Sequence, residues 1–318
     1  MNEIEGENPV GNRPTQGADD NSINFNEVVA TFEAEWQEAV YRGGDRWLIY
    51  PEANPKRQWD LFERVKIEQI QKLLLERNIR QGRVLEYGCG SAGVSIFLAN
   101  QGFQSIAFDI SRNALEIAGI NRNRHKSEST EGHFDLCRGD TFNLPFKDES
   151  FDIVMSFGLL EHFDRDTIYS SLHEVLRTLK PNGLFLADIT HGKFSIRKAG
   201  LALTFVGSFL SSLLRLRLNA LPRLYAEFFH EHYENDLDYD DYVGILKAYE
   251  LGSVQMQVCR PFPPLLLPSA TDTLCIKITD TLYTKVMKIF LPFWKWFDRT
   301  DNWLINRIGW MYLVSARK

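Results

Sequence analysis

The sequence predicts an α/β protein with a doubly wound sheet of seven mostly parallel strands, a helical N-terminal cap and C-terminal insertions. Short apolar runs alternate with segments of helical period from residue 83 onward, which is the pattern of βαβ units. Three glycines, Gly88, Gly90 and Gly93, follow the first apolar run, where a strand must turn tightly into a helix. A chain of 318 residues that is 44% apolar can bury the core of such a sheet.

The N-terminal part divides into a tail and a cap. Residues 1–23 are acidic and polar and contain no apolar run, so we expect a disordered tail and no signal peptide. Residues 24–80 place apolar side chains at helical spacing in two stretches, which a loop with Pro51 and Pro55 separates. We therefore expect a helical cap over residues 24–80.

Residues 81–190 contain the predicted core of alternating strands and helices. Apolar runs predict strands at 84–87, 105–109, 137–140, 151–160 and 183–190. Helical patterns predict helices at 94–101, at 111–118 with Ser111 as the N-cap, and at 166–180. This order favours a parallel sheet with helices on both faces.

Two segments after the fifth strand depart from a compact α/β core. Residues 191–250 predict a helical lid insertion, in which the uncharged run 199–214 is shorter than the roughly 20 residues of a spanning helix. That run either faces the core as a lid or lies on a membrane with its flanking cations. Residues 251–318 predict the last two strands with an aromatic helical insertion between them. The aromatic and lysine residues of this insertion suit a core anchor, an apolar acceptor, a lipid surface or a second subunit.

The glycine loop has the chemistry of a cofactor site. Its spacing is E-x-G-x-G-x-x-G from Glu86 through Gly93, and the acidic Asp109 ends the next predicted strand. An acid there can accept two ribose hydroxyls, as in dinucleotide and S-adenosylmethionine sites, whereas the alternative is a structural tight turn. Glu86 would repel a pyrophosphate but attract a cationic aminoacyl group. The loop therefore favours S-adenosylmethionine over NAD.

Four segments, "VLEYGCGSAG", "AFDIS", "GDTFNLPFKDESFDIVMSFGLLEHF" and "EVLRTLKPNGLFLADI", together resemble the class I S-adenosylmethionine-dependent methyltransferase family, with its Rossmann-like fold. The similarity extends over residues 83–189 and is greatest to the small-molecule subgroup that includes quinone-biosynthesis enzymes. The resemblance implies that S-adenosylmethionine is the cofactor. It implies cofactor-binding roles for Glu86, Tyr87, Gly88, Cys89 and Gly90 under the methionine part, Asp109 at the ribose, Ile110, Asp140 and Thr141 at the adenine, and Phe157 and Gly158 beneath the sulfonium.

Glu161 and His162 are the candidate catalytic residues. They follow the fourth predicted strand, and a histidine there could take a proton from an acceptor hydroxyl. The alternative is that this pair shapes the pocket and caps the next helix. Asp140 has a similar alternative as a turn-forming acid. We expect no essential metal, because Gly158 and Leu159 stand where metal-dependent relatives would carry a further acid.

The predicted activity is direct methyl transfer to a small or lipid-like, largely apolar acceptor, and a noncatalytic scaffold of the same fold is the alternative. An oxidoreductase is a weaker alternative. The net charge of −6 argues against nucleic acid as a partner. Four cysteines without metal-like spacing favour a cytoplasmic protein, with peripheral membrane contact through 199–217 or 282–297 as an option. The sequence does not indicate the acceptor atom or the oligomeric state.

Overall fold

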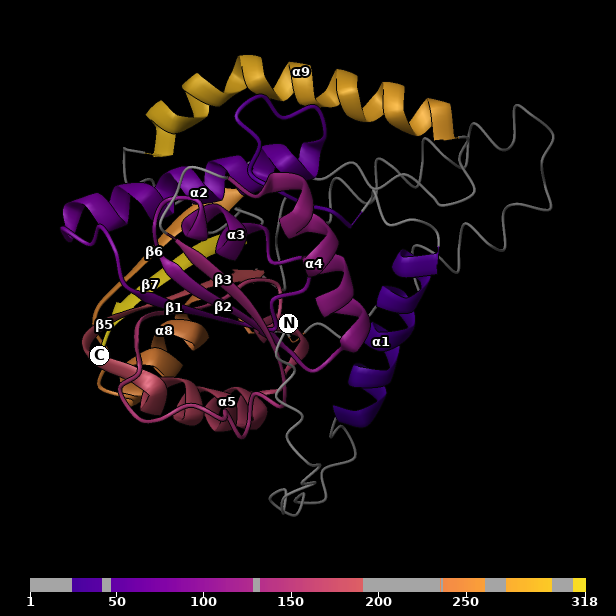
Figure 1. The fold of residues 1–318 in the computed structure, drawn as a ribbon. Coiled ribbons are helices and arrows are strands. Elements are labelled where there is room, and N and C mark those ends of the chain that lie inside the picture. Colours follow the sequence, from indigo (N-terminus) through magenta and orange to yellow (C-terminus); the bar gives the residue numbers. More distant parts are fainter. Residues whose placement is uncertain are drawn as a thin grey trace.

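The computed structural model describes residues 25–41, 47–127, 132–190, 235, 237–260, 273–298 and 311–318. Seven strands in these ranges form one sheet in the order β3-β2-β1-β4-β5-β7-β6 (Figure 1). The strands are β1 (Arg83–Tyr87), β2 (Gln104–Asp109), β3 (His133–Arg138), β4 (Phe151–Ser156), β5 (Leu179–Thr190), β6 (Gly252–Arg260) and β7 (Met311–Arg317). The pairs from β3 to β5 are parallel, and β7 runs antiparallel to both β5 and β6. The predicted fold class is confirmed.

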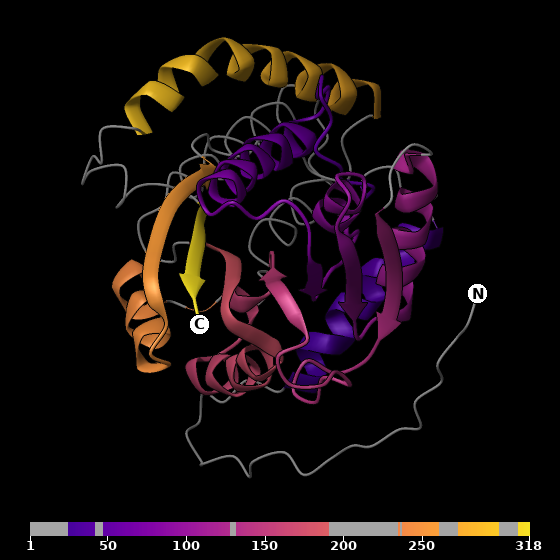
Figure 2. The ribbon, with the colours of Figure 1, turned by 60° about the vertical axis from the view of Figure 1, so that its left-hand side comes forward.

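Helices cover both faces of the sheet. One face carries α2 (Gln58–Glu76), α3 (Gly93–Ala99) and α4 (Arg112–His125), and the other carries α5 (Arg165–Thr178) and α8 (Tyr239–Ala248). A further helix, α9 (Thr273–Asp298), lies outside α2 (Figure 2). The first helix, α1 (Phe25–Tyr41), lies beside α4. A single 3-10 turn, η1 (Leu160–His162), follows β4.

The central strand β1 is buried from Val84 to Tyr87 because both of its faces are covered. Leu85 and Tyr87 pack into the core under α5, whereas Val84 packs into the core under α2. This alternation is the period of two expected of a strand. It places Glu86 on the α2 side of the sheet, although the residue is charged and only 3% exposed.

The third strand lies earlier in the chain than its prediction. The expected strand at 137–140 is observed as β3, residues 133–138, and Asp140 falls in the turn after it. In the described residues β3 pairs with β2 alone, so Phe134 is its one buried side chain. An edge strand therefore lacks the continuous apolar run on which the prediction depended.

The helix that begins after Ser111 is longer than predicted. It continues to His125 and not only to residue 118. Its predicted N-cap is confirmed, since the Ser111 side chain accepts a hydrogen bond from the Ala114 backbone N–H at 3.0 Å.

Several predicted segments lie outside the described residues. These are the tail 1–23, residues 191–234 and 236 of the predicted lid, and the flanks 261–272 and 299–310 of the second insertion. Within the described part, α1 and α2 occupy the predicted cap, and α9 occupies the second insertion. Among the helices in these described ranges, none has the length and apolar content needed to cross a bilayer.

Gly93, at the start of α3, is where two backbone segments meet. A Cβ atom on Gly93 would lie 2.4 Å from the carbonyl oxygen of Ile49. The buried Asn121 amide donates to that same carbonyl at 2.9 Å and to the Ser91 carbonyl at 2.8 Å. The Ile49 backbone is therefore fixed against the loop and has little freedom to move away from a larger residue.

We expect Gly93→Ala to lower the free energy of unfolding by about 1–3 kcal/mol, the usual cost of overpacking a tight site. The measurement is urea denaturation followed by circular dichroism. Gly244→Ala is the matched control, because Gly244 lies within α8 with no neighbouring atom within 4 Å of an added Cβ. Gly244→Ala should leave the free energy of unfolding unchanged or raise it by about 1 kcal/mol. Equal stability of Gly93→Ala and the wild type would contradict the proposed close approach.

Candidate active site

The carboxyl ends of β1, β2 and β4 meet at one edge of the sheet, where a doubly wound fold binds its ligands. The loop after β1 has positive φ at Gly88 (62°) and Gly90 (49°), a conformation that glycine adopts at low cost. A Cβ on Gly88 would lie 2.6 Å from the Leu159 side chain, and one on Gly90 would lie 3.0 Å from the Trp36 ring. The backbone of the loop is thus closely covered on both sides.

Asp109 ties this loop to the start of α4. Its Oδ2 accepts a hydrogen bond from the Gly90 N–H at 3.0 Å, and its Oδ1 accepts one from the Ser111 N–H at 2.9 Å. Burial raises the pKa of the carboxyl, whereas these backbone hydrogen bonds oppose the rise. Each carboxylate oxygen has a second acceptor position, so the group can hold the loop and also accept ligand hydroxyls.

A buried charge cluster lies behind the loop, on the α2 side of the sheet. The Lys66 ammonium is 3.0 Å from Asp188 and 2.9 Å from Glu63. The Glu86 carboxylate accepts from the Ser95 N–H at 3.1 Å, in the first turn of α3. Burial raises the pKa of Glu86 to about 7, against the opposing effects of the Ser95 hydrogen bond and the Lys66 charge. Three carboxyl groups thus face one ammonium, and the cluster favours a cation at this edge.

The end of β4 is fixed by the same cluster. The Gly158 N–H donates to Asp188 Oδ1 at 2.6 Å, and the Lys66 ammonium lies 4.2 Å from the centre of the Phe157 ring. Neither Lys66 nor Asp188 was predicted. Asp188 carries the signal that could have found them, because a charged residue interrupts the apolar run of β5 and is 1% exposed.

The predicted catalytic pair lies on η1, next to β4. Glu161 is 5% exposed, and its Oε1 accepts from the Thr190 hydroxyl at 3.4 Å. Asn235 holds the turn by donating from its side chain to the carbonyls of Leu160 at 3.0 Å and Phe163 at 2.8 Å. Glu161 is therefore packed into the protein. No motif pointed to Asn235, which lies 72 residues beyond Phe163 in the chain.

His162 has a different environment from its neighbour. Its ring is half-buried and contacts Phe32 of α1 edge to face, with centroids 4.8 Å apart. Trp36, one helical turn further along α1, lies over Gly90. The Asn113 amide also donates to Glu33 at 2.6 Å. The predicted cap thus covers the site with α1, a position that the helical apolar stripe of Phe32 and Trp36 indicated only in part.

The residues assigned to the adenine lie at the ends of β2 and β3. Ile110 is half-buried, and Thr141 is 8% exposed. The Asp140 side chain accepts from the Phe142 N–H at 3.0 Å, and its carbonyl accepts from the Asn143 N–H at 3.1 Å. These are the contacts of the turn-forming alternative. They occupy one carboxylate oxygen and leave the other for a ligand.

Two residues of the predicted loop face inward. The Tyr87 side chain is fully buried in the core under α5, so only its backbone borders the site. Cys89 is 6% exposed, and burial, with the Asp109 and Glu86 charges, raises the pKa of its thiol well above the ordinary value. Such a thiol is a poor nucleophile. Among the described residues, no group of three metal-ligating side chains is close enough to hold an ion.

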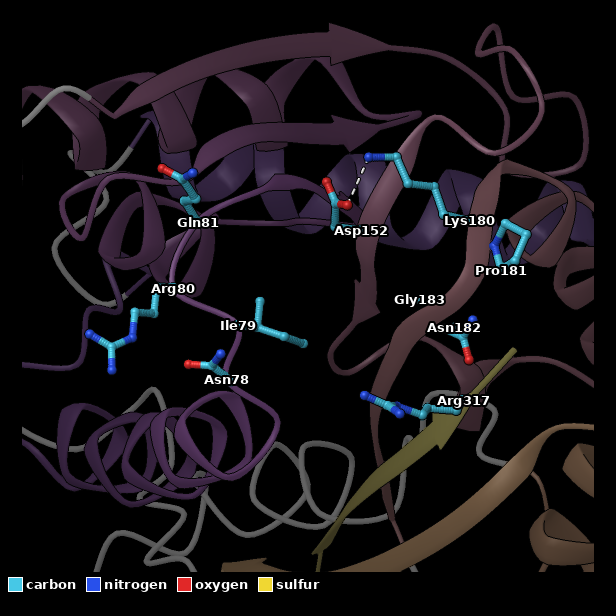
Figure 3. A pocket seen from close by; sticks show the side chains of 10 residues that line it. All are labelled: Asn78, Ile79, Arg80, Gln81, Asp152, Lys180, Pro181, Asn182, Gly183 and Arg317. Atoms are coloured by element: carbon cyan, nitrogen blue, oxygen red, sulfur yellow. Dashed lines mark hydrogen bonds and ion pairs between the residues drawn. The ribbon is translucent and has the colours of Figure 1, made fainter.

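A cavity of about 650 Å³ lies at the opposite edge of the sheet (Figure 3). Asp152 and Lys180, which form an ion pair at 2.7 Å, line it near the starts of β4 and β5. Arg317 of the antiparallel β7 also points into it. None of the predicted site residues lines this cavity. Because parallel strands present their ligands at the carboxyl ends, it is not the candidate active site.

Comparison with known proteins agrees with this fold and loop. A family model described as a methyltransferase domain matches residues 85–187. The fatty-acid O-methyltransferase of Mycolicibacterium smegmatis is 29% identical over 148 residues, which are 46% of this chain and 51% of that protein. A demethylmenaquinone methyltransferase of Leptospira interrogans is 37% identical over 109 residues, or 32% and 41% of the two chains. The chain thus spans about half the length of the curated relatives it matches.

A solved structure shares the fold over most of the chain. It is the magnesium protoporphyrin IX methyltransferase from Synechocystis PCC 6803, with a TM-score of 0.52 at 13% identity, covering 93% of this chain and 100% of that one. The fold and the glycine loop thus define a Rossmann-like protein. Its core matches a methyltransferase domain over residues 85–187, in agreement with the resemblance seen in the sequence.

The pKa of Glu86 predicts a pH-dependent stability. A carboxyl whose pKa rises from 4.5 unfolded to about 7 folded destabilises the fold increasingly as pH rises between these values. Glu86→Gln removes this cost. Without ligand, the free energy of unfolding of Glu86→Gln should equal that of the wild type below pH 4.5. Above pH 7 it should be higher than that of the wild type by about 3 kcal/mol.

Urea denaturation at a series of pH values, without added ligand, measures the difference. The control is Glu116→Gln on the exposed side of α4, which should show little difference at any pH. A difference for Glu86→Gln that does not change with pH would show that the carboxyl is not the destabilising group.

Proposed function

We propose that this protein transfers a methyl group from S-adenosylmethionine to a small or lipid-like, largely apolar acceptor by direct displacement. The observation that carries the proposal is the Asp109 carboxylate, which joins the Gly90 and Ser111 amides at the carboxyl edge of the sheet. This arrangement places a buried acceptor beside the backbone of the glycine loop, as a ribose-binding site requires.

The residues present fit that cofactor. Asp109 would accept the ribose hydroxyls, and Ile110, Asp140 and Thr141 would border the adenine. The excess of buried carboxyl groups, with Glu86 and Asp188 behind the loop, would attract the ammonium and sulfonium charges of the methionine part. When bound, S-adenosylmethionine supplies an electrophilic methyl group, and the transfer needs no covalent bond to the enzyme.

An apolar acceptor is supported by the names of two relatives and by the aromatic residues of the cap. The names of two relatives state a fatty acid and demethylmenaquinone as their acceptors, and both molecules have large apolar parts. The cap residues Phe32 and Trp36 contribute aromatic rings beside His162 and Gly90, which supports an apolar acceptor. Peripheral membrane contact through 199–217 or 282–297 is a prediction separate from the activity. Residues 199–217 lie outside the described residues, whereas 282–297 fall within α9.

Calorimetry and a turnover assay test the proposed function together. The protein should bind S-adenosylmethionine and release S-adenosylhomocysteine when long-chain fatty acids or quinols are supplied. Binding without turnover on any acceptor would favour the scaffold. Binding of NADH in place of S-adenosylmethionine would favour an oxidoreductase.

Asp109→Ala should weaken S-adenosylmethionine binding by about tenfold to a hundredfold, because the ligand loses charge-assisted hydrogen bonds. Isothermal titration calorimetry measures the affinity, and circular dichroism checks the fold. The matched control is Asp135→Ala, an exposed acid on β3 that pairs with His133. Unchanged affinity in Asp109→Ala would remove this residue from the cofactor site.

His162 is the proposed general base for acceptors that lose a proton. His162→Asn should lower kcat by about 10²–10⁴-fold with unchanged S-adenosylmethionine affinity, and the acid limb of the pH–rate profile should disappear. His173→Asn, on the exposed side of α5, is the control and should leave kcat unchanged. A small loss of kcat with the pH–rate profile intact would mean that His162 only shapes the pocket.

A further inference from the structure

Within the part of the chain that the structure describes, α9 packs on the protein through one of its faces. The Asp280 carboxylate accepts a hydrogen bond from the Gln58 N–H at 2.9 Å, at the start of α2. Tyr283, Met287 and Leu291 pack against the apolar core under α2. Figures 1 and 2 both show α9 as the outermost layer over α2. These contacts fix which face of α9 points away from the protein.

The outer face of α9 is apolar. Its exposed side chains are Leu282 (60%), Val286 (37%), Ile289 (74%), Phe290 (52%) and Phe293 (60%). Their spacing of four, three, one and three residues places them along a single face of a helix. A contiguous exposed stripe of large apolar side chains is unusual on a soluble surface and marks an interaction site.

The charges beside this stripe are positive. Lys285 is exposed, and Lys288 lies one turn further along, where its ammonium is 2.8 Å from the Asn54 side chain. The sequence from 281 to 293 contains no acidic residue, although the whole chain has a net charge of −6. The cations are therefore concentrated at the apolar stripe and are not part of a generally basic surface.

The next residues in the sequence are also of types that are enriched at membrane surfaces. Trp294, Lys295 and Trp296 continue the sequence of α9. Tryptophan and lysine are enriched where a helix meets the membrane–water interface. An apolar face flanked by lysines is the pattern of a helix that lies in the plane of a membrane surface.

We infer that the outer face of α9 docks on the surface of an anionic lipid bilayer, with the apolar stripe entering the headgroup region and the exposed Lys285 contacting lipid phosphates. A second copy of the chain is a less suitable occupant. Two copies paired through this face would bring lysines together without an acid from either stripe to balance them. An anionic surface supplies the opposite charge and an apolar layer together.

This inference goes beyond methyl transfer and does not depend on it. If the proposed function is also correct, docking places the enzyme at the phase in which apolar acceptors dissolve. Vesicle binding is measured without cofactor or acceptor, so a failure of either proposal can be recognised separately.

The test is co-sedimentation of the full chain with two kinds of vesicle, phosphatidylcholine alone and phosphatidylcholine mixed with phosphatidylglycerol. The wild type should bind the mixed vesicles and should be released by high salt. Replacing both Ile289 and Phe293 by Glu should lower binding by about tenfold or more. Lys285→Gln should lower it about fivefold.

Leu75→Glu is the matched control, because Leu75 is an apolar residue of α2 with 72% exposure, close to that of Ile289. It should bind vesicles as the wild type does, and all variants should keep the wild-type circular dichroism spectrum. Absence of binding by the wild type, or equal binding by the double Glu variant, would overturn the inference. Light scattering that shows a dimer which only the double Glu variant dissociates would overturn it in favour of a second copy.

Discussion

The hydrogen bonds of the Asp109 carboxylate hold together the two loops on which the candidate site depends. β1 and β2 are parallel neighbours, with Tyr87 paired to Phe108, so their following loops emerge side by side. The Gly90 and Ser111 amides both donate to Asp109, and Ser111 in turn caps α4. One side chain thereby fixes the glycine loop and the direction of the next helix. These hydrogen bonds leave a second lone pair on each oxygen for the ligand-accepting role that we propose.

The sequence was sufficient for the elements whose signals are local. The glycine loop, the Ser111 cap and the buried strands β1, β2, β4 and β5 follow from patterns within a few residues. The edge strand β3 did not, because its outward side chains face solvent and break the apolar pattern. An element that is covered on one side only carries a weaker sequence signal than one covered on both.

The site contacts that the sequence did not predict join residues far apart in the chain. Lys66 and Asp188 are 122 positions apart and meet under the end of β4. Trp36 reaches Gly90 only because α1 packs beside α4. No spacing rule relates such pairs, since their approach is decided by how whole helices pack on the sheet. The carboxyl edge therefore acquires the Lys66–Asp188 ion pair and its aromatic cover from segments outside the glycine motif.

The place of β7 affects how the chain folds during its synthesis. β7 lies between β5 and β6 and pairs with both, yet it is the last of the described strands to leave the ribosome. Until then β5 has an open edge, and β6 has no strand beside it in the sheet. Open edges of this kind invite pairing with other chains. During synthesis, the β5 edge therefore stays open to pairing with other chains until β7 inserts between β5 and β6.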